Sequence, residues 1–163
     1  MALHLKIDKE AIEGESKAHE HVKWIDIDSW SWGVSNSTSV ARGDGSGEGT
    51  AMISDMQINK TVDGASNKIF QACCTGKMFG TITLHATKAI GALNPGTWLK
   101  IELTDCIFTS VSESGAEQGG AQESLSIGFK QLSVEVFTQN DGKGPLTSAG
   151  IKTYDVAGAL GAG

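Results

Sequence analysis

The chain is short of positive charge, and this shortage argues against two classes of partner. Its 163 residues include 13 lysines and arginines against 19 aspartates and glutamates, which gives a formal net charge of -6. The basic residues form no cluster along the chain. Nucleic acids and anionic membrane surfaces attract proteins through basic patches. The sequence therefore predicts no nucleic-acid partner and no membrane insertion.

Long apolar runs and paired cysteines are also missing. The first residues, M-A-L-H-L-K-I-D-K-E, contain no uninterrupted apolar stretch, so we expect neither a secretory signal peptide nor a transmembrane span. Such a chain is made and folded in the cytoplasm. The three cysteines are an odd number without framework spacing, which argues against disulfides. We expect Cys73, Cys74 and Cys106 to be reduced thiols.

Proline is scarce and glycine abundant, with 2 and 21 residues respectively. This composition favours tight turns and close backbone approach over long helices. With 39% hydrophobic residues, a chain of this length supports one sizeable core but not two. We therefore expect a single all-β domain that spans residues 1–163.

The stretch richest in tryptophan, W-I-D-I-D-S-W-S-W-G-V, predicts a strand that changes face partway along. Ile25 and Ile27 share one phase of the alternation, whereas Trp30, Trp32 and Val34 take the other. A β-bulge between the two sets produces such a slip. A strand of this kind suits a curved or closing sheet, because its two ends pack on different layers.

A late strand slips in the same way. Leu125, Ile127 and Phe129 fall in one phase, and Leu132 and Val134 fall in the other. Two slipping strands indicate a sheet that curls onto itself. The predicted fold is a compact β-barrel of antiparallel strands with one flanking α-helix, and its interior is filled by Trp30, Trp32, Val34 and Phe129.

The flanking helix is expected after residue 63. Its apolar stripe runs from Ala65 to Cys73, Asp63 or Ser66 can cap its start, and Gly76 can end it in the left-handed conformation. Alternating patterns predict further strands. These strands are expected at residues 3–7, 52–60, 82–87 and 99–111, with a long mobile loop at residues 36–50 and a loose C-terminal tail at residues 157–163.

The local motifs that could carry chemistry are weak. His19 and His21 offer two metal ligands, but no third is positioned nearby, and residues 9–23 have the composition of a solvated connection. Asp26 and Asp28 lie on the polar face of their strand. The glycine-rich loop matches no phosphate-binding pattern. The sequence predicts no catalytic residue, no metal site and no cofactor.

Several short segments stand out in their order and spacing: I-x-G-E-S at Ile12–Ser16, W-S-W-G at Trp30–Gly33 followed by Ser35, the glycine-rich loop, A-C-C-T-G-K at the end of the helix and the late L-x-I-x-F strand. Together they closely resemble the Hcp family, the haemolysin-coregulated proteins of the bacterial type VI secretion system. The resemblance runs from about Leu3 to Phe137. Tyr154 and Asp155 also resemble the C-terminal Y-D of the family, whereas the apolar tail after them departs from its pattern.

The resemblance implies a tube protein that is not an enzyme. Six copies would close into a ring, and stacked rings would form a hollow conduit that a contractile sheath expels. Effectors would travel in the lumen, and spike proteins would be further partners. Such a protein assembles in the cytoplasm and is secreted by its own machine without a signal peptide. The implied contact between rings is the loop at residues 36–50, with Arg42, Asp44 and Glu48 as its charged members.

Strand alternation places small residues opposite the tryptophans. If Trp30 and Trp32 face the core, then Ser29, Ser31 and Gly33 face away from it. In a tube subunit, such small residues suit the lumen wall, and Ser31 is the best candidate. The outer face of the sheet is an equally simple location for a serine.

Two other functions remain open from the sequence. One is a secreted effector or adhesin-type protein that has the same barrel and acts outside the cell. The other is a small hydrolase with a dispersed site. The hydrolase requires a pocket with a serine or cysteine within hydrogen-bond reach of His4, His19, His21 or His85.

Overall fold

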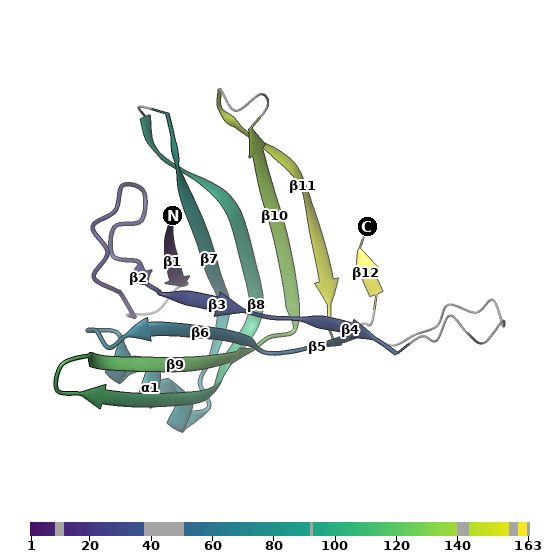
Figure 1. Ribbon diagram of the computed structural model, residues 1–163. Helices are drawn as coiled ribbons and strands as arrows, with labels where there is room; N and C mark the ends of the chain where they lie inside the picture. Colours follow the sequence, from purple (N-terminus) through teal and green to yellow (C-terminus); the bar gives the residue numbers. More distant parts are fainter. Residues whose placement is uncertain (9–11, 38–50, 92, 140–143, 157–159, 163) are drawn as a thin grey trace.

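The computed structural model shows a mainly β, antiparallel protein with one helix among its described residues, as the sequence predicts (Figure 1). The structure describes residues 1–8, 12–37, 51–91, 93–139, 144–156 and 160–162. The helix is α1 (Ser66–Thr75), and the strands are β1 (Ala2–Ile7), β2 (Ile25–Asp26), β3 (Ser29–Ser31), β4 (Val34–Asn36), β5 (Ala51–Ile53), β6 (Met56–Thr61), β7 (Met78–Ile90), β8 (Leu93–Ala116), β9 (Gly120–Gly128), β10 (Gln131–Gln139), β11 (Leu146–Asp155) and β12 (Leu160–Ala162).

The strands form two layers that share the long strand β8. Its first part pairs with β7 and β10, in an upper layer ordered β12-β11-β10-β8-β7-β1-β2. Its second part pairs with β9, in a lower layer that continues through β6 to β3. Figure 1 shows that the lower strands run across the direction of the upper ones.

The tryptophan-rich stretch switches between these layers where its phase slips. β2 pairs with β1 in the upper layer, and β3 pairs with β6 in the lower one. Between them, the Ile27 N–H donates to the Leu3 carbonyl (3.1 Å) and the next N–H, of Asp28, donates to the Asn59 carbonyl (2.8 Å). The slip is therefore a change of layer, and the expected bulge is an interruption between two short strands.

The late strand behaves in the same way. β9 pairs with β6 and β8 in the lower layer, whereas β10 pairs with β8 and β11 in the upper one. The prediction of a closed barrel is wrong for the described strands, because β2, β3 and β12 each end a run of paired strands. Strands that switch layers at corners allow two sheets to pack at a large angle, and the edge strands then need not pair to close a barrel.

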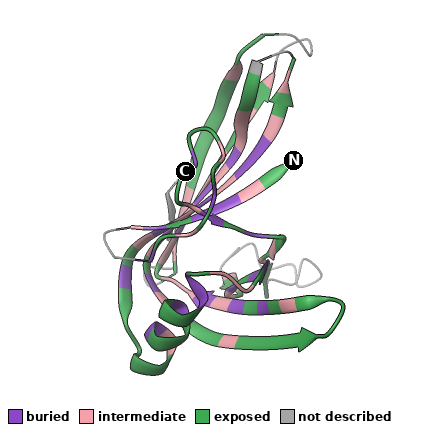
Figure 2. Ribbon diagram, turned by 90° about the vertical axis from the view of Figure 1, so that its left-hand side faces the viewer, coloured by how far each residue is buried: buried purple, intermediate pink, exposed green. Residues whose placement is uncertain are grey.

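The core lies where the two layers and α1 meet. Ile25 and Ile27 are buried as predicted, and Ile58, Ile82 and Phe108 are at most 1% exposed. Figure 2 shows buried residues on strands of both layers and on α1, where they alternate with exposed ones. Among the described residues, no helix is long and apolar enough to cross a membrane.

The predicted core residues near the layer switch are only partly buried. Trp30, Trp32 and Phe129 are half-buried and pack against the core cluster. Val34 is 56% exposed, so its assignment to the core is wrong. It lies on β4, which pairs with β5 in a separate two-stranded ribbon beyond the main sheet (Figure 1).

The helix forms as the sequence predicts. Gly76 follows it with a φ of 64°, and the N–H groups of Gly76 and Lys77 donate to carbonyls of its last turn. Neither predicted capping residue caps it: the N-cap position is Ala65, which makes no side-chain capping bond, and Asp63 and Ser66 bond within the turn that precedes the helix. The Asp63 carboxylate accepts the Ala65 N–H (2.9 Å), and the Ser66 hydroxyl accepts the Asp63 N–H (3.0 Å).

Two predicted loose segments lie partly outside the described residues. This applies to most of the loop at residues 36–50, including Arg42, Asp44 and Glu48, and to residues 157–159 and 163 of the tail. Residues 160–162 are not loose: as β12 they pair with residues 153–155 of β11. The unpaired edge of β11 offers backbone groups that a chain end can bind.

Candidate functional site

The lower layer presents a face of neutral polar side chains. In β3, β6, β9 and the end of β8, apolar residues alternate with hydroxyl and amide residues, and the second set points away from the core. We call this surface the hydroxyl–amide face. Its members are uncharged: Ser29, Ser31, Gln57, Asn59, Thr61, Ser110, Ser112, Ser114, Gln122, Ser124 and Ser126.

These side chains form rows across the strands. Ser29 pairs with Asn59, which pairs with Ser124. The Asn59 amide nitrogen donates to the Ser29 hydroxyl (3.0 Å), and the Ser124 hydroxyl donates to the Asn59 amide oxygen (2.7 Å). In the next row, the Ser126 hydroxyl donates to the Gln57 amide oxygen at 2.7 Å. Hydrogen bonds within the face therefore hold Ser29, Asn59, Ser124, Gln57 and Ser126 in place.

The sequence prediction found only the edge of this face. Ser29 and Ser31 are exposed members of β3, opposite the half-buried Trp30. Gly33 is exposed just beyond β3, and its N–H donates to the Ser54 hydroxyl (2.9 Å). The sequence reasoning missed the members on β6, β8 and β9. The strict alternation of β6 and β9 was the signal that could have found them.

A second cluster lies under residues 12–24, which we call the strap. The sequence predicts a solvated connection here, and this is wrong, because Ile12, Ser16 and His21 are buried. The Ser16 N–H donates to the Trp24 carbonyl (3.0 Å), and the Lys23 N–H returns to the Ser16 carbonyl (2.8 Å). A Cβ at Gly14 would collide with the Trp24 backbone, so the strap closes this tightly only with glycine there.

Three histidines from distant parts of the chain meet under the strap. The rings of His4 on β1 and His21 on the strap are stacked, with centroids 4.5 Å apart. His21 Nε2 lies 2.9 Å from Nδ1 of His85 on β7, and Trp24 packs against both of these rings. His19, by contrast, is exposed and contributes its backbone carbonyl, 3.1 Å from His21 Nδ1.

The environment of this cluster disfavours positive charge. Burial lowers the pKa of the His85 imidazole from 6.5 to about 4, and the neighbouring His21, Lys100, His4 and Lys6 act in the same direction. Burial also lowers the pKa of His21, although the bond to the His19 carbonyl opposes this effect. Both rings are therefore neutral at pH 7.

A serine also lies near a histidine, as the hydrolase interpretation requires. Ser16 Oγ is 3.5 Å from His4 Nδ1, and both residues line a surface hollow of about 530 Å³ together with Asp26. The Asp26 carboxylate, however, lies 2.8 Å from the same nitrogen. A histidine that activates a serine needs one ring nitrogen for the serine and the other for the carboxylate. This arrangement does not support a serine nucleophile.

No metal site appears among the residues that the structure describes, since none of their histidine, cysteine and carboxylate groups cluster in threes or more around a possible ion. His19 is exposed and His21 is buried, so the two side chains do not share a site. The histidine cluster is joined by ring contacts and hydrogen bonds between its own members.

A buried ion pair fixes the helix to the lower layer. Lys60 Nζ on β6 lies 2.9 Å from Oε2 of Glu123 on β9 and 2.9 Å from Oδ1 of Asp63, and the first two side chains are 0% exposed. The Ser66 hydroxyl, at the start of α1, donates to the same Glu123 oxygen (2.7 Å). The sequence reasoning also missed this network.

Comparison with known proteins gives a consistent result. The family model for "Type VI secretion system effector, Hcp" matches residues 4–136. The protein hcp1 of Pseudomonas aeruginosa is 33% identical over 138 residues, which cover 83% of each chain.

Solved structures agree with these sequence matches. A type six secretion system protein superposes with a TM-score of 0.88 at 26% identity and covers 99% of each chain. Hcp1 from Salmonella typhimurium gives a TM-score of 0.78 at 27% identity, over 99% of this chain and 98% of its own.

Proposed function

Since the chain belongs to the Hcp family of type VI secretion tube proteins, we propose that six copies close into a ring and that rings stack into a hollow conduit. The family match over residues 4–136 is the observation that carries this proposal. The role is structural rather than catalytic. Sheath and spike proteins are the proposed external partners, and effectors are the proposed cargo.

The strand edges support ring closure. β3 pairs with β6 on one side, and β2 and β12 likewise end the upper layer. Edges of this kind carry backbone N–H and C=O groups that a neighbouring copy can pair with. A ring needs head-to-tail contacts between different surfaces of identical copies, and edges on opposite sides of one subunit provide them.

The hydroxyl–amide face suits the lumen wall. Its residues carry no charge and no large apolar group, and hydrogen bonds from Ser124 and Ser126 occupy the amide oxygens of Asn59 and Gln57. A conduit for different cargo proteins benefits from a wall that is wetted but binds nothing tightly. Ser29, Ser31 and Gly33 would therefore lie at one border of the wall, and the serines of β8 and β9 would extend it.

The ribbon of β4 and β5 suits contact between rings. It projects from the body (Figure 1), and Val34 and Met52 are 56% and 69% exposed on it. Arg42, Asp44 and Glu48, the proposed charged members of this contact, lie between β4 and β5 in the sequence and outside the described residues. A neighbouring ring would cover the exposed apolar side chains, which a lone subunit leaves in water. Assembly in the cytoplasm would precede export.

Size-exclusion chromatography with light scattering tests the ring. We expect a mass near six times the 17.0 kDa of one chain, and electron micrographs of the same fraction should show rings with a central hole. A persistent monomer at high concentration would contradict the tube and would favour a secreted effector or adhesin-type protein.

Arginine substitutions test the lumen wall. Ser31→Arg and Ser124→Arg place charge and bulk on the hydroxyl–amide face, so we expect rings of unchanged mass that lose most of a co-expressed effector. Asn67→Arg is the matched control, because Asn67 is exposed on α1, which covers the opposite face of the lower layer. Equal effector retention by all three variants would place the lumen elsewhere.

A further inference from the structure

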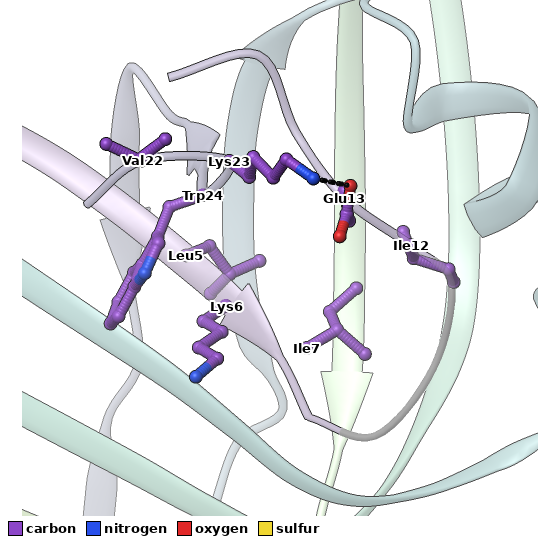
Figure 3. Close-up of a pocket in the computed structure, with 8 residues that line it drawn as sticks. All are labelled: Leu5, Lys6, Ile7, Ile12, Glu13, Val22, Lys23 and Trp24. Carbon is purple, nitrogen blue, oxygen red and sulfur yellow. Dashed lines mark ion pairs between the residues drawn. The ribbon is translucent and has the colours of Figure 1, made fainter. Parts of the chain in front are cut away.

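The strap is joined to the upper layer through polar rings, which is an unusual way to hold a buried segment. His21 contributes its ring to a stack with His4 and a hydrogen bond to His85. Figure 3 shows the strap residues Val22 and Trp24 beside β1, with Lys23 paired to Glu13 on the exposed side (3.1 Å).

The hydrogen bonds determine where the protons lie in the neutral cluster. The His19 carbonyl can only accept, so His21 Nδ1 carries the hydrogen and His21 Nε2 is the acceptor. The His85 Nδ1 therefore donates to His21 Nε2. This leaves the lone pair of His85 Nε2 buried, and it has no hydrogen-bond partner in the described part of the chain.

A further proton has no favourable position on these two rings. On His21 Nε2, it would point directly at the N–H of His85. On His85 Nε2, it would create a buried cation whose new N–H has no acceptor. The ionisable groups that surround the two rings are His4 and Lys6 of β1, Asp26 of β2, Glu20 of the strap and Lys100 of β8.

The two carboxylates in this set, Asp26 and Glu20, would do little to stabilise a positive charge on His21 or His85. Asp26 already bonds to His4 Nδ1 at 2.8 Å, and its side chain is 63% exposed. Glu20 is exposed on the strap. Lys6 lies over the Trp24 ring, 5.8 Å from its centroid, and Lys100 is the cross-strand neighbour of His85. Positive neighbours therefore remain close to any added proton.

We propose that the strap is an acid-sensitive switch: protonation of His21 and His85 breaks the bond between their rings and releases residues 12–24 from β1 and β7. Release would uncover the rings of His4 and His85 and enlarge the hollow of about 450 Å³ that the strap forms with Leu5, Lys6 and Ile7. The rest of the sheet, which has no such cluster among its described residues, stays folded.

The direction of the pH dependence follows from the lowered pKa values. The pKa of His85 is about 4 with the strap closed and returns to about 6.5 in an open, solvated strap. Between these values the open form binds more protons, so the closed form is fully stable above about pH 6.5 and loses stability as the pH falls. Within that window, each pH unit raises the open population by up to about tenfold per titrating ring.

Hydrogen exchange of the full chain, read by mass spectrometry between pH 7.5 and pH 4.5 and corrected for intrinsic rates, tests the switch. The N–H groups of Gly14, Ser16 and Lys23 are bonded within the strap and report its opening. We expect their exchange to rise at least about tenfold from pH 7 to pH 5, while the amides of β9 keep their protection. A strap that stays closed to pH 4.5, or a β9 that opens with it, would overturn the proposal.

Variants separate the two rings from other acid effects. In the double variant His21→Gln and His85→Asn, amides replace both titrating rings, so the rise between pH 7 and pH 5 should disappear. His19→Gln is the control, because this exposed side chain lies outside the cluster, and it should behave like the unmodified protein.

If the strap of the double variant is already open at pH 7.5, a variant that keeps both histidines and changes a neighbouring charge still tests the switch. Lys100→Met removes a positive neighbour of His85, which raises the pKa of the closed-state ring and so narrows the acid-sensitive window. The midpoint of strap opening should then move to lower pH. An unchanged midpoint would show that His85 does not control the strap.

Discussion

Replacing Lys60 by methionine is expected to lower the free energy of unfolding by about 3–5 kcal/mol. The substitution removes the cation that lies 2.9 Å from both Glu123 and Asp63 and leaves a fully buried carboxylate without its partner. One oxygen of Glu123 has no hydrogen-bond partner among the described residues even with the lysine present. Urea unfolding, at a concentration where both variants have the same assembly state, measures the change.

Two further variants show whether the loss comes from burial of an unpaired charge. Lys23→Met removes an ion pair with Glu13 in which both side chains are at least 60% exposed, so we expect a loss of about 0–1 kcal/mol. Lys60→Met combined with Glu123→Leu removes both charges and should recover much of the stability. If the double variant is as unstable as Lys60→Met alone, packing rather than charge dominates at this site.

Replacing Phe108 by alanine should cost about 3–5 kcal/mol, the usual range for a fully buried phenylalanine. Its ring is 1% exposed and meets Phe79 edge-on, with centroids 5.6 Å apart. The residue lies where β8 passes from β7 to β9, and the pairing register shifts between Phe108 and Ser110. The cavity would open where the two layers join, and urea unfolding would again measure the loss.

Phe70→Ala is the matched control for this substitution. Phe70 is 57% exposed on α1, so the same change in side chain should cost less than about 1 kcal/mol. Equal losses from the two variants would indicate that a neighbouring copy covers Phe70 in the assembled protein. The mass of each variant in solution would then show whether Phe70→Ala weakens the assembly.

Elements whose sequence pattern lies within neighbouring residues were predictable. The helix has an apolar stripe and Gly76 at its end, and it forms where expected, although neither Asp63 nor Ser66 caps its start. β6 and β9 also follow their alternation closely. The phase slips at residues 28–29 and 130–131 correctly marked changes of layer, because a strand that moves between layers must reverse its buried side.

The buried polar groups were not found, although part of the signal was present. Lys60 follows Met56 and Ile58 in the buried phase of β6, and Glu123 precedes Leu125 and Ile127 in the buried phase of β9. Two opposite charges in the buried phases of different strands are compatible with an ion pair. The sequence does not state that β6 and β9 are neighbours, so the pair emerges only when the sheet is assembled.

The histidine cluster was the hardest contact to predict, because its members lie far apart in the chain. His4, His21 and His85 are 17 and 64 residues apart, and residues 12–24 have the polar composition of a surface loop. Their burial depends on the backbone bonds of Ser16 with Lys23 and Trp24, and on the close approach at Gly14.

The amino-acid sequence by itself determined the mainly β class, the helix at residues 66–75, the two changes of layer and the resemblance to the Hcp family. Each of these depends on residues that are near neighbours in the chain or on an ordered series of short segments. The tertiary structure alone decided which faces are buried between strands, that the described strands leave open edges instead of a closed barrel, and which polar groups meet. These features depend on distances between segments far apart in the chain, and burial of a polar group is stable only when such a distant partner is present.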